Sequence, residues 1–365
     1  MDEERSEQKV FVMNLSLKGS GFGLCILDTI NQIRYCEREN LIPVALYDAS
    51  AESHFYDPEH GDSMWEQYFE PLGEYSARDL ELRADDPRHP LRADNRIELD
   101  RSEIIEMFEQ HEDSLFAWPY GRWRRGDLED IESWYADQRA KGRQIVRRYI
   151  RPRAEIAAKV DDFWQAKLEG SYVLGVQIRG TDLHYAPPVS PAEYFESIDR
   201  RIGEHPDLKI FLATDQRQYV EVMRDRYGER LVSYDVLRSD DEVAPFKMDA
   251  SPYKKGEDVL IDILLLARSD HLLRGASHVA EMAMYFGPDS LECTDLAIRK
   301  TKAFGQDYGK LWSYDASRPA WSLLKKTELD AVSDNAASQT PLETLIYAAR
   351  SFTLNLARRL GLLRH

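Results

Sequence analysis

The sequence predicts an α/β protein with two Rossmann-like domains that face each other across a cleft, followed by a C-terminal helical segment. Three observations support this fold class. Short apolar runs alternate with longer segments of helical periodicity, which is typical of parallel strands covered by helices. This alternation occurs in two separate regions of the chain. A length of 365 residues exceeds one ordinary core, and an apolar content of 43% is enough to fill two.

The first region begins with a strand, a glycine loop and a helix. Residues 9–17, KVFVMNLSL, are rich in strand-forming side chains, and residues 19–23, GSGFG, predict a loop. Apolar residues recur at helical spacing over residues 24–40. The run LIPVALYD at residues 41–48 predicts a second strand, so these segments form a βαβ unit.

A region without clear periodicity and a long helical region follow. Residues 49–100 are rich in Asp, Glu, His and Pro, which predicts loops around one short aromatic helix containing MWEQYF. Residues 139–168 show one long helical pattern. Pro152 is expected to kink or split it, because proline lacks the backbone N–H and its ring clashes with the preceding turn. We expect the first domain to cover residues 1–165 and the second to cover residues 166–310.

The second region alternates strands and helices more regularly. Strands are predicted for the runs YVLGVQI, LKIFLATD, LVSYD and DHLLR, and helices for residues 191–205, 218–228, 256–268 and 278–287. Beyond residue 302 the pattern weakens, and residues 333–341 resemble a linker. Residues 341–365 predict an amphipathic helix with arginines on its polar side, within a third segment at residues 311–365.

Composition excludes several classes of function. A formal net charge of -17 repels phosphate backbones, which argues against extended nucleic-acid binding but not against one small phosphorylated ligand. The three cysteines lack metal-ligand spacing, so neither a disulfide framework nor structural zinc is expected. No apolar run has the length of a secretion signal or membrane span, which predicts a cytoplasmic protein.

Polar side chains follow three predicted strands of the second region. Arg179, Thr181 and Asp182 come after the first, Thr214 and Asp215 after the second, and Ser277 precedes the last helix. Ligands bind beyond the carboxyl ends of strands in open α/β sheets. An arginine fork and a helix N-terminus both suit a diphosphate.

Each motif taken alone has a simpler structural interpretation. Arg179 and Asp182 could form an ordinary structural ion pair, and Thr214 with Asp215 could cap a helix. The GSGFG loop has only part of a dinucleotide fingerprint. The combination of the three strand ends is what favours a binding site.

These motifs resemble a known superfamily. The segment GVQIRGTD, then FLATD, then LIDILLLARSDHLLRGASHVAEMA, is similar in order and spacing to the fucosyltransferases that include α-1,6-fucosyltransferases, nodulation-factor fucosyltransferases and protein O-fucosyltransferases. The KGSGFG loop and MWEQYF extend the resemblance over residues 11–287. It implies a GT-B-like fold and inverting transfer of fucose from GDP-fucose, with no required metal or other cofactor.

The resemblance also implies roles for individual residues. Arg179 matches the arginine that contacts the donor diphosphate, Asp262 the acid that reads the guanine edge, and Ser277 with His278 the pair against the phosphates. The predicted donor-binding set is Gly19, Gly21, Phe22, Gly23, Gln177, Arg179, Thr214, Asp215, Asp262, Ser277 and His278. A fixed guanidinium and helix N–H groups would stabilise the charge that develops on the departing diphosphate.

The general base is left open by departures from the family pattern. Gln177 stands where many members have histidine, Leu183 stands where many have lysine, and the following loop LHYAPPVSP carries no carboxylate. Asp182, His184 and Tyr185 are the nearby candidates, and Asp182 could instead orient Arg179. A base-free, dissociative reaction is a further alternative. The predicted catalytic residues are Arg179, Asp182 and His184.

The acceptor is expected to be a glycan, a lipid-linked glycan or a protein. Trp118, Tyr120 and Trp123 could stack on its sugars, or could form an aromatic hinge against the long helix. The C-terminal helix could contact the inner face of a membrane or pack back on the first domain. Another GDP-sugar as donor, or a non-catalytic protein that binds sugar nucleotides or glycans, are the competing hypotheses.

Overall fold

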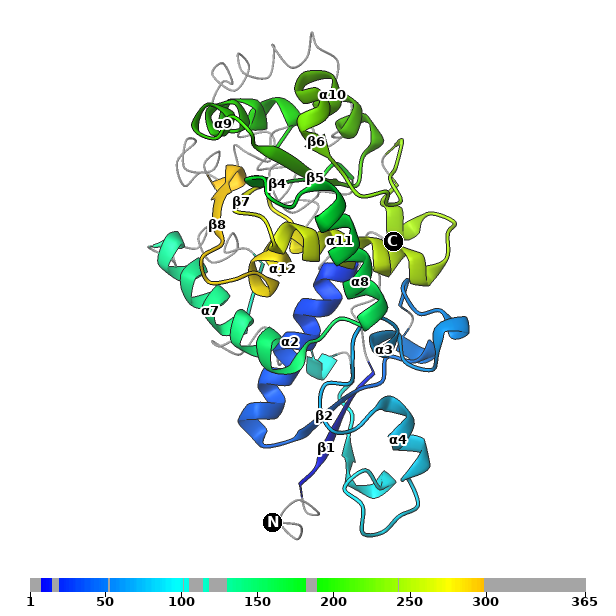
Figure 1. Ribbon diagram of the computed structural model, residues 1–365. Helices are drawn as coiled ribbons and strands as arrows, with labels where there is room; N and C mark the ends of the chain where they lie inside the picture. Colours follow the sequence, from blue (N-terminus) through cyan, green and yellow to red (C-terminus); the bar gives the residue numbers. More distant parts are fainter. Residues whose placement is uncertain are drawn as a thin grey trace, which may run out of the picture.

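The computed structural model describes residues 8–14, 20–51, 53–100, 102–104, 114–117, 130–181, 189–241 and 243–298, and Figure 1 shows their arrangement. These residues form two parallel sheets covered by helices, which confirms the predicted α/β class. The smaller sheet has the order β2-β1-β3, and the larger has the order β6-β5-β4-β7-β8. Their strands are β1 (Val10–Met13), β2 (Ile42–Ala45), β3 (Arg96–Ile97), β4 (Val173–Ile178), β5 (Lys209–Thr214), β6 (Leu231–Val232), β7 (His271–Arg274) and β8 (Glu292–Asp295).

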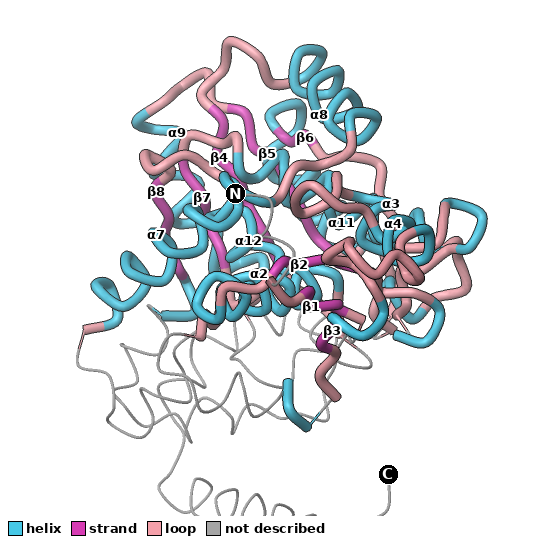
Figure 2. Tube along the Cα trace, turned by 90° about the horizontal axis from the view of Figure 1, so that it is seen from below, coloured by secondary structure: helices cyan, strands magenta, loops and turns pink. Residues whose placement is uncertain are grey.

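The five-stranded sheet is wound in both directions from its middle strand. From β4 the chain first adds β5 and β6 on one side, then crosses to add β7 and β8 on the other, and every pairing is parallel. Figure 2 shows these strands side by side, with helices on both sides of them. The order reverses between β4 and β7, and a crevice at such a reversal is where open α/β sheets bind ligands.

Helices cover both faces of this sheet because alternate strand residues point to opposite sides. Val173 and Phe211 pack in the core with α8, α11 and α12, whereas their neighbours Leu174 and Ile210 pack in another with α9 and α10. The α-helices are α2 (Phe22–Glu39), α3 (Met64–Tyr68), α4 (Ala77–Leu82), α7 (Ile131–Tyr149), α8 (Ala154–Lys167), α9 (Pro191–Glu204), α10 (Arg217–Tyr227), α11 (Pro252–Ala267) and α12 (His278–Phe286).

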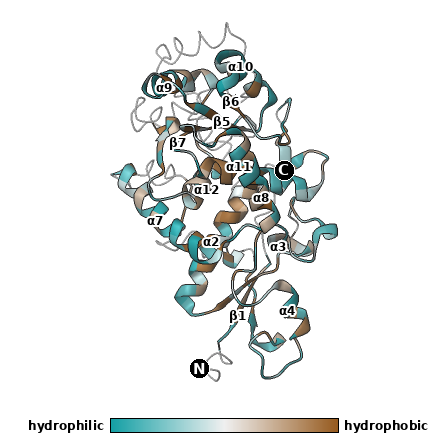
Figure 3. Cartoon of the chain, viewed as in Figure 1, coloured by the Kyte–Doolittle hydropathy of each residue, from teal (hydrophilic) through white to brown (hydrophobic). Residues whose placement is uncertain are grey.

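Helix α2 joins the two sheets into one packed structure. It follows β1 of the small sheet, yet it packs against both α11 and α12 of the large one. The largest apolar core therefore runs from Phe11 of β1 to Leu272 of β7. Figure 3 shows apolar residues in brown where α2, α11 and α12 meet. The N-terminus of α2 is thereby held beside the larger sheet.

The long helical region begins earlier than its sequence pattern indicated. Helix α7 starts at Ile131, where Asp130 accepts hydrogen bonds from the backbone N–H groups of Glu132 and Ser133 at 3.1 and 3.2 Å. It ends at Tyr149, and α8 begins at Ala154, so the predicted split near Pro152 is confirmed. The sequence analysis placed the start at residue 139, although Ile131, Trp134 and Tyr135 already form a buried apolar stripe at helical spacing.

Other elements correct the sequence-based expectations. The strands β3 and β8 and the helix α4 were not predicted. Gly23 belongs to α2 rather than to a loop, since Gly21 is the N-cap of that helix. The cysteines are free thiols, and burial raises the pKa of Cys25, Cys36 and Cys293.

The C-terminal extension predicted for residues 311–365, with its amphipathic helix, lies outside the described residues. Within the described part of the chain, none of the helices combines the length and apolarity needed to cross a membrane.

Candidate active site

A cavity of ≈ 250 Å³ opens between the strand ends of the large sheet and the N-terminus of α2. It is bordered by the residues after β4 and β5, by one face of α11 and by the start of α12. All the predicted donor-binding residues that the structure describes line it, namely Gly21, Phe22, Gly23, Gln177, Arg179, Thr214, Asp215, Asp262, Ser277 and His278. Segments distant in the sequence therefore meet in one cavity, as the strand-end pattern predicted.

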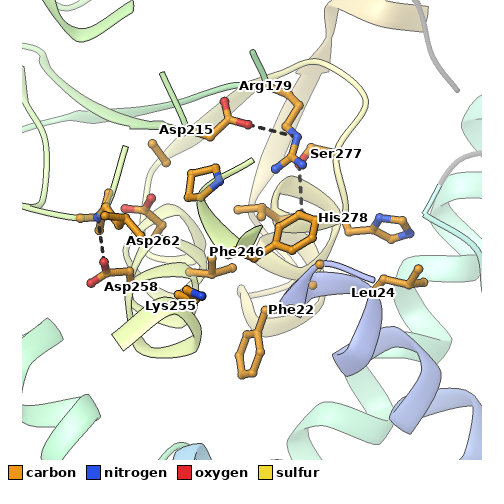
Figure 4. A pocket seen from close by; sticks show the side chains of 18 of the residues that line it. Phe22, Leu24, Arg179, Asp215, Phe246, Lys255, Asp258, Asp262, Ser277 and His278 are labelled. Carbon is orange, nitrogen blue, oxygen red and sulfur yellow. Dashed lines mark hydrogen bonds and ion pairs between the residues drawn. The ribbon is translucent and has the colours of Figure 1, made fainter. Parts of the chain in front are cut away.

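Arg179 is positioned by Asp215 from the neighbouring strand end. The Arg179 Nε lies 3.2 Å from Asp215 Oδ2 (Figure 4). Asp215 also accepts hydrogen bonds from the N–H of Gly180 at 2.7 Å and from the Thr181 hydroxyl at 2.5 Å. Its carboxylate thus holds the first three residues after β4, Arg179, Gly180 and Thr181. The alternative that Asp215 caps a helix is wrong, because Gln216 is the N-cap of α10.

Two helix N-termini reach the same end of the cavity. Ser277 is the N-cap of α12 and accepts a hydrogen bond from the N–H of Val279 at 3.2 Å. Gly23, in the first turn of α2, lies so close to α12 that an added Cβ would be 3.0 Å from the carbonyl carbon of His278. Partial positive charge from both helices therefore adds to that of Arg179.

His278 is neutral in this environment. Burial, with the nearby positive charges of Arg179 and Arg274, lowers its pKa to about 3. A neutral imidazole can donate one hydrogen bond and accept another, but it adds no positive charge to this end of the cavity.

A buried ion cluster holds α12 in place behind the cavity. Glu281 of α12 pairs with Arg274 of β7 and with Arg139 of α7, whose Nε lies 3.0 Å from Glu281 Oε1. Both Arg274 and Glu281 are fully buried. The two guanidinium groups keep the pKa of Glu281 low in spite of its burial. Separating these groups would leave a buried charge without a partner, which is strongly unfavourable. The cluster therefore fixes the N-terminus of α12.

The opposite end of the cavity is acidic and has an open hydrogen-bond acceptor. Asp262 lies on the inner face of α11, and its buried Oδ1 has no hydrogen-bond partner among the described residues. Burial raises the pKa of Asp262 to about 8; Arg238 opposes this shift, and Asp258 adds to it. Both oxygens of Asp258 already have partners. One accepts a hydrogen bond from the Leu237 N–H at 2.8 Å, and the other pairs with Lys254.

Several cavity residues had no detectable signal in the sequence. Phe246 and Pro245 come from a single turn of 3-10 helix, and Phe55 comes from the irregular segment after β2. Asp258 and Lys255 could have been found, because they lie four and seven residues before Asp262 and so share its helix face. The other cavity residues missed by the sequence analysis are Ser20, Leu24, Ala213, Val236, Leu237, Val259 and Val279.

The remaining predicted site residues lie outside the described residues. They are Gly19 of the glycine loop, the base candidates Asp182, His184 and Tyr185, and the acceptor candidates Trp118, Tyr120 and Trp123. The orienting partner of Arg179 in the structure is Asp215, which the sequence analysis did not consider for that role.

Two acidic residues outside the cavity form ion pairs with arginines on the surface. Asp161 pairs with Arg268 at 2.5 Å, and Asp240 pairs with Arg217 at 2.7 Å. Across the described residues, no three His, Cys, Asp or Glu side chains gather in the way that metal ligands do.

Comparison with known proteins gave matches only among solved structures. Neither the models of protein families nor the curated proteins contain a match to the chain. NodZ α-1,6-fucosyltransferase co-crystallised with GDP is 19% identical, with a TM-score of 0.48 over 77% of this chain and 93% of that chain.

Two further solved structures are also similar to the chain. A mutant of Arabidopsis thaliana FUT1 in complex with GDP is 11% identical, with a TM-score of 0.41 over 80% of this chain and 74% of that chain. POFUT1 in complex with GDP is 10% identical, with a TM-score of 0.42 over 79% of this chain and 99% of that chain. These proteins are fucosyltransferases, the superfamily that the sequence motifs resemble.

Proposed function

We propose that the protein is an inverting glycosyltransferase that uses a GDP-sugar, with GDP-fucose as the favoured donor. The observation that carries the proposal is the pairing of two opposite ends in one cavity. Arg179 and two helix N-termini form an anion-binding end, and the open Oδ1 of Asp262 forms an acceptor end. A guanine nucleotide matches both, because its diphosphate is anionic and its base edge carries N–H donors.

The acceptor end favours guanine over other bases. A carboxylate can accept two adjacent N–H bonds, which the N1 and N2 positions of guanine supply and which adenine and uracil do not present together. A buried acceptor left without a donor costs more than an exposed one, so a base that lacks these donors is rejected. Asp262 is therefore the group we assign to base selection.

The anion-binding end would act on the leaving group. In the transfer step the acceptor oxygen bonds to the anomeric carbon from the face opposite the nucleotide. The carbon–oxygen bond to the diphosphate breaks, and its electron pair stays on GDP. Arg179, held by Asp215, and the first N–H groups of α12 would stabilise that charge as it develops. The acceptor proton leaves to a base for which Asp182, His184 and Tyr185 remain the candidates.

The acceptor is proposed to be a glycan, a lipid-linked glycan or a protein. We retain Trp118, Tyr120 and Trp123 as the side chains that could stack on it. Transfer without a divalent cation is also part of the proposal. Release of GDP from GDP-fucose should continue at an unchanged rate when EDTA is added, and loss of activity that Mg²⁺ or Mn²⁺ restores would overturn this part.

Calorimetric titration with GDP, UDP, GDP-fucose and GDP-mannose tests the proposed function. The wild-type protein should bind GDP and GDP-fucose more tightly than UDP. Asp262→Asn should lose most of the preference for GDP, because an amide offers only one acceptor oxygen to the base edge. Asp289→Asn is a matched control: Asp289 is a surface carboxylate that pairs with Arg147 at 2.9 Å and does not line the cavity.

The outcomes of this panel separate the alternatives. Equal binding of GDP and UDP by the wild-type protein would overturn a guanine-nucleotide function. A preference for GDP-mannose would retain the enzyme class and change the donor. Tight GDP-fucose binding without GDP release, tested over a panel of acceptor glycans, would favour the non-catalytic alternative.

A further inference from the structure

Among the described residues, Phe246 is the largest apolar side chain that the large sheet's half contributes to the cavity wall. It belongs to the 3-10 turn Pro245–Lys247, between β6 and α11, and only 8% of its surface is exposed. In Figure 4 its ring is drawn between Asp262 on one side and Ser277 and His278 on the other. A ring in this position borders the space between the acidic end and the anion-binding end.

Residues from the first half of the chain fix the orientation of this ring. Its centroid lies 6.3 Å from that of Phe55 at an interplanar angle of 51° and 5.3 Å from that of His54 at 48°. A Cβ added to Gly21 would be 3.8 Å from the Phe246 ring. Tilted aromatic contacts of this kind hold a ring at one angle rather than letting it turn freely.

The wall near Asp262 also carries apolar side chains. Val236 and Leu237 come from the segment after β6, and Val259 comes from α11, one turn before Asp262. A buried carboxylate acceptor with apolar side chains and an aromatic ring beside it suits a flat heterocycle. Such a ligand presents N–H donors at its edge and a π surface on its faces.

We infer that Phe246 is the stacking platform for the nucleobase of the donor. This inference rests on the proposed function, since it assumes a nucleotide donor whose base edge meets Asp262. Asp262 would select the edge of the base, and Phe246 would bind its face. Because Phe55 and Gly21 orient the ring, the base subsite is completed by the first half of the chain rather than by the large sheet alone.

Titration of GDP, guanosine and pyrophosphate into Phe246 variants tests this role. Phe246→Ala should weaken the binding of GDP and guanosine by about 10- to 100-fold, the range expected for loss of one base–aromatic stack. Pyrophosphate has no base, so its affinity should not change. Phe246→Tyr should restore guanosine binding, whereas Phe246→Leu, which keeps apolar volume without a π face, should restore little of it.

The control and the opposing outcomes are specific. Phe195→Ala removes a partly buried aromatic ring of α9 that packs on Tyr227 of α10, outside the cavity lining, and should leave all three affinities unchanged. Unchanged guanosine affinity in Phe246→Leu overturns the inference, and so does equal weakening of guanosine and pyrophosphate. Failure of the wild-type protein to bind GDP would instead overturn the proposed function together with this inference.

Discussion

The two ends of the cavity are built in opposite ways. At the anion-binding end the charged groups are held by neighbours: Asp215 fixes Arg179 and Gly180, while Arg274 and Glu281 fix α12. At the acidic end Asp262 keeps one buried oxygen without a partner among the described residues. The charged groups of the anion-binding end are held in place before a ligand arrives, whereas the acidic end keeps an open acceptor.

This difference follows from what each end would do in the reaction. Charge that develops on a leaving group is stabilised best by dipoles that need no reorganisation, which explains a fixed arginine and fixed helix N-termini. Selection of the nucleobase works differently. A buried acceptor that stays without a hydrogen bond costs free energy. It therefore strongly favours a ligand that donates to it and disfavours ligands that cannot. Rigidity at one end and an open acceptor at the other therefore suit catalysis and specificity respectively.

Of the predicted effects, the loss of GDP release on removal of Arg179 should be the largest. Arg179→Ala deletes the guanidinium that lines the anion-binding end, and GDP release from GDP-fucose should slow by roughly 10²- to 10³-fold, as for other preorganised donors to a developing charge. Guanosine affinity should not change, because guanosine does not reach that end. Release assays and guanosine titrations give the two measurements.

Arg217→Ala is the matched control, because Arg217 also pairs with an aspartate, Asp240, but lies outside the cavity lining. It should retain wild-type rates. A large loss of guanosine affinity in Arg179→Ala would show that the two ends are not separate.

The next largest effect should be that of pH on the binding of the nucleobase. Burial raises the pKa of Asp262 to about 8, so this carboxyl is mostly protonated at pH 6 and must ionise to accept two N–H donors. Guanosine affinity should therefore rise about tenfold per pH unit below pH 8 and level off above it. His278 cannot produce this profile, because its lowered pKa of about 3 keeps it neutral throughout.

Titrations of guanosine between pH 6 and 8.5 measure this effect, and Asp262→Asn should give a flat profile. The free protein provides an independent check of the sign. The native Asp262 keeps a proton that the unfolded chain releases near its ordinary pKa. The free energy of unfolding should therefore fall as pH rises toward 8, and less so in Asp262→Asn. Guanosine affinity independent of pH in the wild-type protein would contradict an ionising acceptor at this end.

Loss of Asp215 should have a smaller effect on the anion-binding end. Asp215→Asn keeps the size of the side chain but replaces one acceptor oxygen by an NH₂ group, which faces either the guanidinium or an N–H donor of the turn. A displaced Arg179 should slow GDP release about tenfold with little change in the KM for GDP-fucose, since misplacement affects the transition state more than the ground state. Asp240→Asn, which disturbs the exposed pair with Arg217, is the control. Equal rates in the two variants would remove Asp215 from the positioning role.

The sequence identified the parts of this site that follow from regular structure. Arg179 and Ser277 mark where buried strands end, and Asp262 interrupts an apolar helix, so their positions are set by periodicity. The role of Asp215 could not be read from the sequence, because its partners lie 34 and 35 residues away, just after another strand. Phe246 lies in a turn of three residues, which is too short for any periodic signal. The strand β3 has two residues and is equally hard to predict, whereas β6, also of two residues, lies within the predicted run LVSYD.

Substitutions at two helical glycines should have the smallest effects, and they test most selectively whether the two cavity ends are separate. An added Cβ at Gly23 would press against the backbone of His278 at 3.0 Å, whereas one at Gly203 in α9 would meet no described atom within 4 Å. Gly203→Ala should be neutral or stabilising by up to about 1 kcal/mol, from helix propensity alone. In Gly23→Ala, overpacking of about 1–3 kcal/mol opposes that gain.

The Gly23 contact should also affect the two cavity ends unequally. Displacement of α12 moves its N-terminal N–H groups, so pyrophosphate affinity should fall severalfold in Gly23→Ala. Guanosine affinity should remain unchanged, since Asp262 lies on α11. Thermal unfolding and the two titrations measure both effects. A fall in guanosine affinity as large as that of pyrophosphate would mean that α2 supports the whole cavity, and that the contrast between a fixed end and an open end is not built into separate helices.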